Sequence, residues 1–118
     1  MSVKRVIADR KGREAEAQAA QWLMQQGFEV LAERRKTKLG EIDLIARKKG
    51  LVAFIEVKWR KRSRDLDTAI DERRLARVAA AVEVVAHEYT EPDDDIRIDV
   101  ILLAPGSRPR HIENAWMP

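Results

Sequence analysis

The spacing of apolar residues changes along the chain, and each change marks a different predicted element. From Lys11 to Gly27 the apolar residues recur at helical spacing, and Gly27 is a suitable residue to end a helix. Three shorter runs follow, rich in β-forming residues and separated by Gly40 and Gly50. They cover residues 28–35, 40–47 and 51–59. The pattern therefore predicts one amphipathic helix followed by three strands.

The second half of the chain holds the clearest helical pattern. Between residues 75 and 89, seven residues fall at offsets of 0, 3, 4, 7, 10, 11 and 14. A turn over residues 90–95, a strand over 96–104, a second turn and a short strand over 111–116 complete the chain. The charged residues 60–68 have the composition of a flexible loop. The sequence thus predicts an α/β fold in the order α-β-β-β-α-β-β, as a single domain over residues 1–118.

Composition excludes several classes of chemistry. The 118 residues include no cysteine, which rules out a disulfide framework, a thiolate nucleophile, and zinc or iron-sulfur sites with cysteine ligands. No apolar stretch reaches the roughly 18 residues of a membrane span. The first ten residues lack the apolar run of a signal peptide. We therefore expect a cytoplasmic protein that has no membrane partner.

Charge is distributed unevenly along the chain. Residues 1–77 contain 20 Lys and Arg against 12 Asp and Glu, whereas residues 78–118 contain 3 against 8. A basic first part favours an anionic partner such as nucleic acid, although a solvated surface of mixed sign would give the same count. The asymmetry alone leaves these two interpretations open.

Carboxylates meet on the predicted hairpin around residues 49–50. If these two residues form the turn, Asp43 falls opposite Glu56, and Glu41 falls opposite Lys58. All four side chains would then project from one face, with directly opposed Cβ atoms about 4.5–5.5 Å apart. A longer turn would shift every one of these pairs.

Two opposed carboxylates among apolar neighbours need compensation. Mg²⁺ or Mn²⁺ is the natural candidate, because both ions prefer oxygen ligands from one or two carboxylates and from phosphates. Lys58 would lie beside the ion, where it could orient an attacking water or help to deprotonate it while the metal polarises a phosphodiester. The competing interpretation is an exposed strand pair in which Glu41 and Lys58 form a cross-strand ion pair.

These residues also match a known pattern. Asp43, twelve intervening residues and then Glu56, Val57 and Lys58 resemble the core motif of the PD-(D/E)xK, or restriction-endonuclease-like, nucleases. The wider run of GREAEAQAAQWLMQQGFEVL, GEIDLIA, FIEVKWR, IRIDVI and NAW resembles the YraN family of small bacterial proteins, whose core is similar to archaeal Holliday-junction resolvases. The resemblance implies a restriction-endonuclease-like fold, with a mixed central sheet flanked by helices.

The resemblance also implies roles for individual residues. Lys58 would be the catalytic lysine, and Glu14 competes with Glu16 for the place of the helix carboxylate. The metal site would combine carboxylates with one main-chain carbonyl: Asp43, Glu56, Val57 and Glu16. Two departures from the family pattern leave the substrate contacts open: Arg34 stands where the family has Asn, and Arg74 stands where it has Lys. Ala15 stands where the family has Gly, which could alter how the helix approaches the site.

A basic segment follows the predicted site and would contact the phosphate backbone. Its members are Arg60, Lys61, Arg62, Arg64, Arg73, Arg74 and Arg77. The leading hypothesis is a metal-dependent endodeoxyribonuclease that cuts branched or structured DNA, and the resemblance to resolvases implies a homodimer. The alternatives are a non-catalytic nucleic-acid-binding module of the same fold that acts with a partner protein, and a protein-interaction domain that uses an exposed sheet edge.

Overall fold

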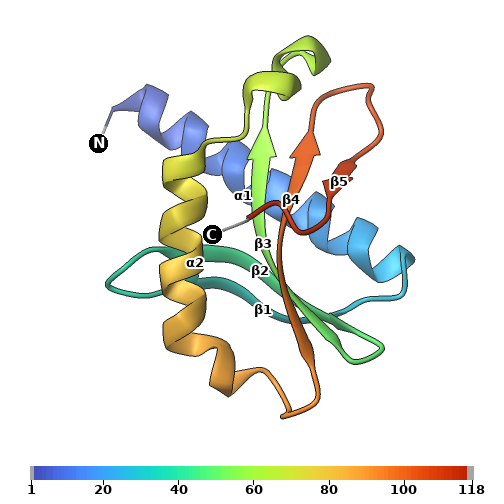
Figure 1. Ribbon diagram of the computed structural model, residues 1–118. Coiled ribbons are helices and arrows are strands. Elements are labelled where there is room, and N and C mark those ends of the chain that lie inside the picture. Colours follow the sequence, from blue (N-terminus) through green and yellow to red (C-terminus); the bar gives the residue numbers. More distant parts are fainter. Residues whose placement is uncertain (1, 117–118) are drawn as a thin grey trace.

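The computed structural model describes residues 2–116, and residues 1, 117 and 118 lie outside the described part. The order of helices and strands is the predicted one. In chain order the elements are α1 (Val3–Gln25), β1 (Glu29–Lys36), β2 (Glu41–Lys48), β3 (Leu51–Trp59), the 3-10 helix η1 (Ser63–Thr68), α2 (Glu72–Val85), the 3-10 helix η2 (Ala86–Glu88), β4 (Asp95–Leu103) and β5 (Arg110–Ile112), shown in Figure 1.

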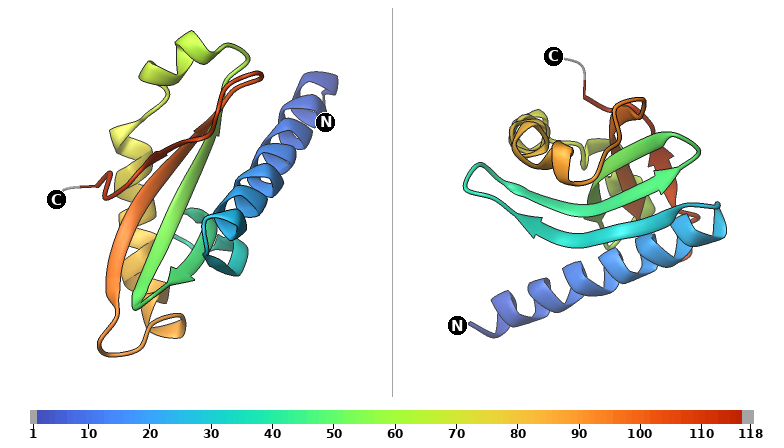
Figure 2. Two further views of the ribbon diagram at one scale, coloured as in Figure 1. Left: turned by 90° about the vertical axis from the view of Figure 1, so that its right-hand side faces the viewer. Right: turned by 90° about the horizontal axis from the view of Figure 1, so that it is seen from below.

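One mixed sheet lies between the two long helices. Its strand order is β1-β2-β3-β4-β5. The β3 and β4 strands are parallel, and the other neighbouring pairs are antiparallel. Figure 2 shows α1 on one face of the sheet and α2 on the other. The protein is therefore a mixed α/β protein with a five-stranded sheet flanked by helices, as the sequence predicts at this level.

Within residues 2–116, no helix combines the length and the apolar character that a membrane span requires.

Each face of the sheet has its own apolar core. On the α2 face, Leu75, Val78 and Val82 of the helix pack with Phe54 and Val100 of the strands. On the α1 face, the helix contributes small residues and one leucine, which pack against the other side of the same strands: Ala15, Ala19, Ala20 and Leu23. The central strand β3 is consequently buried on both sides, which explains its continuous apolar sequence.

The first helix is longer than the apolar spacing predicts. It begins at Val3, with the Ser2 hydroxyl accepting a hydrogen bond from the Arg5 amide at 3.2 Å, and ends before Gly27, whose φ is +92°. Residues 3–10 are exposed and contact neither core, although Val3, Val6 and Ile7 stand at helical spacing. The prediction of a start at Lys11 was wrong because it detected only the packed part of the helix.

Two further expectations need correction. The charged residues 60–68 are not a flexible loop throughout, because Ser63–Thr68 form η1 and Leu66 within it is fully buried. One apolar side chain is enough to dock this segment on the α2 face. The last strand is also shorter than predicted, since only Arg110–Ile112 pair with β4.

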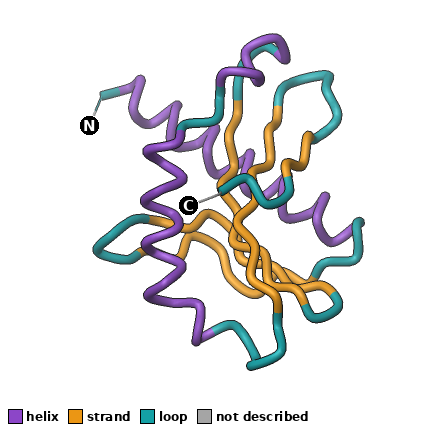
Figure 3. Tube along the Cα trace, in the orientation of Figure 1, coloured by secondary structure: helices purple, strands orange, loops and turns teal. Residues whose placement is uncertain are grey.

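The sheet forks between β2 and β3. The predicted two-residue turn is present, and Lys48 pairs with Leu51. The β2–β3 ladder ends at Leu44 and Ile55. Beyond that point β2 continues only with β1, and β3 continues only with β4 up to Trp59, as the diverging ribbons in Figure 1 and the diverging strand traces in Figure 3 show. At this end of the sheet, the facing backbone groups of β2 and β3 therefore no longer pair with each other.

Gly40 allows the β1–β2 connection to lie close against α2. A Cβ atom at this position would lie 2.9 Å from the main-chain oxygen of Arg77. We expect Gly40→Ala to lower the free energy of unfolding by about 1–3 kcal/mol, because the backbone there cannot move aside easily. Urea unfolding would measure this loss. Gly12→Ala is the control: a Cβ there has open space, so a stability gain of up to about 1 kcal/mol is expected.

Candidate functional site

The fork brings Asp43 into a buried position between the two strands. Its side chain is 4% exposed, and its Oδ2 accepts a hydrogen bond from the Val57 main-chain N–H at 2.8 Å. The side-chain oxygen of Asp43 therefore replaces the backbone carbonyl that would accept this hydrogen bond if the ladder continued. The prediction that Asp43 and Glu56 are directly opposed ladder partners was wrong, as was the pairing of Glu41 with Lys58, because pairing between β2 and β3 stops before them.

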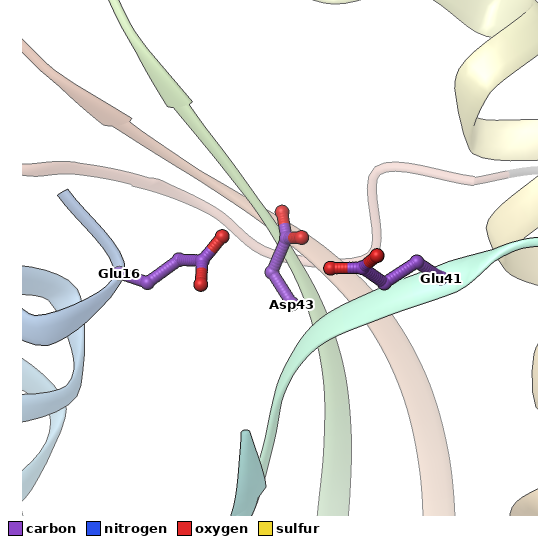
Figure 4. Close-up of side chains that lie close together, drawn as sticks. All are labelled: Glu16, Glu41 and Asp43. Atoms are coloured by element: carbon purple, nitrogen blue, oxygen red, sulfur yellow. The ribbon is translucent and has the colours of Figure 1, made fainter. Parts of the chain in front are cut away.

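Three carboxylates converge at this position. One oxygen from each of Glu16, Glu41 and Asp43 lies within 4.8 Å of the others. Figure 4 shows Glu16 reaching from α1 and Glu41 from the start of β2, with Asp43 between them. Glu14 is more than half exposed and pairs with Lys11 at 3.9 Å instead. The structure thus places Glu16, and not Glu14, beside Asp43, and it adds Glu41 to the group.

Glu56 forms ion pairs with basic side chains of α2 and of its own strand. Its Oε1 lies 3.2 Å from Arg74 Nε of α2 and 3.4 Å from Lys58 Nζ. Its Oε2 is buried and has no hydrogen-bond partner among the described residues. Asp43 nevertheless lies near Glu56, whose charge acts on it, as well as near Glu16 of α1. Lys58 pairs with Glu56 and not with Glu41.

Burial makes both central carboxyls harder to ionise, and nearby negative charge adds to this effect for Asp43. Burial, together with the nearby charge of Glu56, raises the pKa of Asp43 to about 7, although the hydrogen bond from Val57 opposes the change. Burial also raises the pKa of Glu56, against the attraction of Arg74 and Lys58. A site that gathers carboxylates in this way has a strong electrostatic reason to accept a cation.

Arg34 is the part of this site that the motif did not predict. It stands on β1 between the residues paired with Leu44 and Ile42, and therefore level with Asp43. Its φ is +53°, a left-handed conformation that asparagine adopts more readily than arginine. Its Nε donates to Glu16 Oε1 at 2.6 Å, and burial of the pair is partial. One carboxylate of the cluster is thus already neutralised by the protein.

The predicted basic residues surround the end of β3 and the start of α2. Most of their side chains are exposed: Lys61, Arg62, Arg64, Arg73 and Arg77. Arg60 is partly buried, and its guanidinium donates to the main-chain oxygen of Trp59. Arg74 is engaged with Glu56. A second approach lies on the α1 side, where a cleft of about 490 Å³ is lined by Arg13, Glu16, Ala17, Glu33, Arg34 and Lys36.

A buried polar network outside this site was also missed at the sequence level. Asp99 is fully buried and accepts hydrogen bonds from Arg97, His111 and the Asn114 main-chain N–H. Burial opposes ionisation of Asp99, but these donors outweigh it and lower its pKa. Alternation of apolar and charged residues in the strand gave the only signal. The network ties β5 and the residues after it to β4.

The raised pKa of Asp43 predicts how stability depends on pH without metal. Between its ordinary value of 3.8 and its folded value of about 7, the folded chain holds a proton that the unfolded chain has released. Stability should therefore fall as pH rises from about 5 to about 8. Thermal unfolding in a chelator at constant ionic strength would measure this. Asp43→Asn should flatten the dependence, and a rise in stability over this range would contradict the assignment.

The fold and the site define a small mixed α/β protein with a carboxylate cluster at the fork of its sheet. A family model described as "Uncharacterised protein family UPF0102" matches residues 15–103. The chain therefore belongs to the UPF0102 family, which is the YraN family that the motifs resemble.

Full-length relatives agree with this assignment. The chain is 61% identical over 116 residues to a UPF0102 protein of Erythrobacter litoralis, covering 98% of this chain and 100% of the relative. It is 53% identical to a UPF0102 protein of Sphingopyxis alaskensis, covering 97% and 98% of the two chains. A UPF0102 protein of Rhizorhabdus wittichii is 47% identical, with 96% of each chain covered. The names of these relatives state no activity.

Proposed function

We propose that the protein is a metal-dependent endonuclease of the restriction-endonuclease-like type, which hydrolyses phosphodiesters in branched or structured DNA. The observation that carries this proposal is the forked sheet, where Asp43 meets the Glu56-Val57-Lys58 segment. The buried Glu56 Oε2 without a hydrogen-bond partner supports it, because an orphaned carboxylate oxygen is costly unless it binds something.

The available donors fit Mg²⁺ or Mn²⁺. Asp43, Glu16 and Glu41 offer carboxylate oxygens within a small volume, and Glu56 offers its free Oε2. The Val57 N–H points to Asp43 on the β2 side of β3. Since the N–H and C=O of one strand residue point to the same side, we expect the Val57 carbonyl to face the fork as well. An all-oxygen set of this kind is what both ions prefer.

In this proposal each residue has a distinct task. A bound cation would polarise the scissile phosphodiester and lower the pKa of an attacking water. Lys58, held by Glu56 at 3.4 Å, would donate to that water or to a phosphate oxygen and fix the line of attack. Arg34 would hold the Glu16 carboxylate in place through their 2.6 Å hydrogen bond. The exposed basic residues after Lys58 would hold the phosphate backbone.

One observation favours a second candidate, a non-catalytic nucleic-acid-binding module that acts with a partner protein. The protein supplies its own cations to two of the carboxylates, since Arg74 and Lys58 contact Glu56, and Arg34 contacts Glu16. Such internal neutralisation reduces the need for a metal. In this case the basic surface would bind DNA without turnover.

A single set of measurements separates the two candidates. Duplex, nicked, single-stranded and four-way-junction DNA would be incubated with the protein in Mg²⁺, in Mn²⁺ and in a chelator. Asp43→Asn, purified in the same way, controls for a contaminating nuclease. Cleavage that needs both the cation and Asp43 supports the nuclease. Salt-sensitive DNA binding that survives Asp43→Asn, with no cleavage by the wild-type protein, supports the binding module.

A homodimer, which cutting both strands of a junction would favour, would be sought by sedimentation at the same protein concentrations.

A further inference from the structure

A groove of about 720 Å³ lies beside the end of β3, away from the carboxylate cluster. Figure 2 shows the N-terminal part of α1 passing next to the ends of β3 and β4. The groove is lined there by Lys4, Ile7, Ala8, Lys11, Gly12, Trp59, Lys61 and Pro105. It thus uses the exposed first turns of α1, which the two apolar cores leave unoccupied.

The lining has a definite chemical character. Three of its residues are lysines, and none of the described lining residues is acidic. The remaining surface is apolar and includes the indole of Trp59 and the side chain of Ile7. This combination complements a ligand that is flat and apolar on one side and negatively charged on the other. A nucleotide, with its base and its phosphate, has both properties.

The indole presents its face to the groove. Lys11 Nζ lies 5.4 Å from the centre of the Trp59 ring, in a cation-π arrangement. The Lys11 side chain is half exposed and its pairing with Glu14 is loose, at 3.9 Å. A base could therefore take the ring face while Lys11 turns to a phosphate. Trp59 packs only partly against the α1-side core, so its outer surface remains accessible.

The groove and the proposed active site are connected through one strand. Lys58 and Trp59 are consecutive in β3, so their side chains project from opposite faces. From Glu56 to Trp59 the strand advances by about 10 Å. One nucleic-acid strand that crosses the end of β3 could place a phosphate at Lys58 and a neighbouring base on Trp59.

We propose that this groove binds an unpaired nucleotide of the substrate, with its base stacked on Trp59 and its phosphates held by Lys4, Lys11 and Lys61. The inference rests on the proposed function and narrows its substrate class. The preferred DNA carries a single-stranded segment next to the scissile phosphate, as at a flap or an open branch point. A fully paired duplex cannot supply that base.

Fluorescence anisotropy in a chelator tests binding without turnover. The probes are a single-stranded oligonucleotide, a flapped duplex and a fully paired duplex of equal length. We expect Trp59→Ala and Ile7→Glu to weaken binding of the first two about 5- to 100-fold, and binding of the paired duplex less than about twofold. Trp59→Phe should retain most of the affinity, and Lys61→Ala should reduce the salt slope for single strands by about 0.7.

Ile96→Glu is the matched control, because Ile96 is 49% exposed and Ile7 is 50% exposed, whereas Ile96 does not line the groove. Unchanged binding in this control, together with loss in Ile7→Glu, supports the groove. The groove proposal would be overturned if the variants lost equal affinity for all three probes, or if Trp59→Ala lost no affinity for the single strand. Ile7→Glu could instead abolish binding to phosphatidylserine vesicles or self-association while oligonucleotide binding persists. Either of those results would also overturn it.

The two proposals can fail separately. Trp59-dependent binding of single strands without any metal-dependent cleavage would retain the groove and reject the nuclease. Cleavage that requires Asp43, with the same binding by wild-type protein and Trp59→Ala, would retain the nuclease and reject the groove.

Discussion

Asp43→Asn is expected to slow metal-dependent DNA cleavage by roughly 10³-fold or more, while the protein stays folded. The carboxylate is the central member of the cluster, and in the proposed reaction a bound metal would contribute several kcal/mol of charge stabilisation, where each 1.36 kcal/mol is about a tenfold change in rate. An asparagine can still accept the hydrogen bond from Val57, so the fork should persist. Single-turnover assays would measure the loss of cleavage rate, and calorimetry with Mn²⁺ would measure the accompanying loss of metal binding.

The same substitution should raise the stability of the metal-free protein. At pH 8 the ionised Asp43 is buried beside other carboxylates, as its pKa of about 7 indicates, and a neutral amide removes that cost. We expect the midpoint of thermal unfolding in a chelator to rise by at least about 4 °C. Asp93→Asn is the control, since this exposed aspartate should change neither activity nor stability. Full activity of Asp43→Asn would reject the proposed metal site.

Asp99→Ala should be among the most destabilising single substitutions in the chain. The fully buried carboxylate accepts from Arg97 at 2.8 and 2.9 Å, from His111 at 2.7 Å and from the Asn114 N–H at 2.9 Å. Removing it takes away the acceptor that these donors share and leaves the partly buried Arg97 guanidinium with its ion pair to the exposed Glu113. Breaking a buried pair in this way typically costs about 3–5 kcal/mol, a large share of the roughly 5–15 kcal/mol of a whole domain.

Urea unfolding at pH 7 would measure that loss. Asp95→Ala provides the control, because Asp95 lies on the same strand but is exposed, and such substitutions change stability by about 0.5 kcal/mol or less. His111→Asn would report on one donor alone and should cost less than Asp99→Ala. A change below about 1 kcal/mol for Asp99→Ala would show that the network does not hold β5 to the sheet.

Much of the fold follows from local patterns. The element order, the turn at residues 49–50 and the register of its flanking pairs all come from apolar spacing and from the backbone freedom of Gly50. Burial of β3 on both faces is also visible in its continuous apolar run. The start of α1 was missed, although Val3, Val6 and Ile7 stand at helical spacing, because residues 3–10 pack against neither core and so short a run gives a weak signal.

The family and the candidate carboxylates Asp43 and Glu56 were determined by the sequence itself, because residue identity and order along the chain are what a motif records. The choice of Glu16 over Glu14 came from the structure. The tertiary structure alone decided how these side chains meet. Ladder pairing stops at Leu44 and Ile55, so β2 leaves β3. Asp43 then meets Glu16 of α1, and Glu56 pairs with Arg74 of α2. Beyond the fork β2 stays paired with β1 and β3 stays paired with β4, and these are long-range pairings that no local spacing encodes.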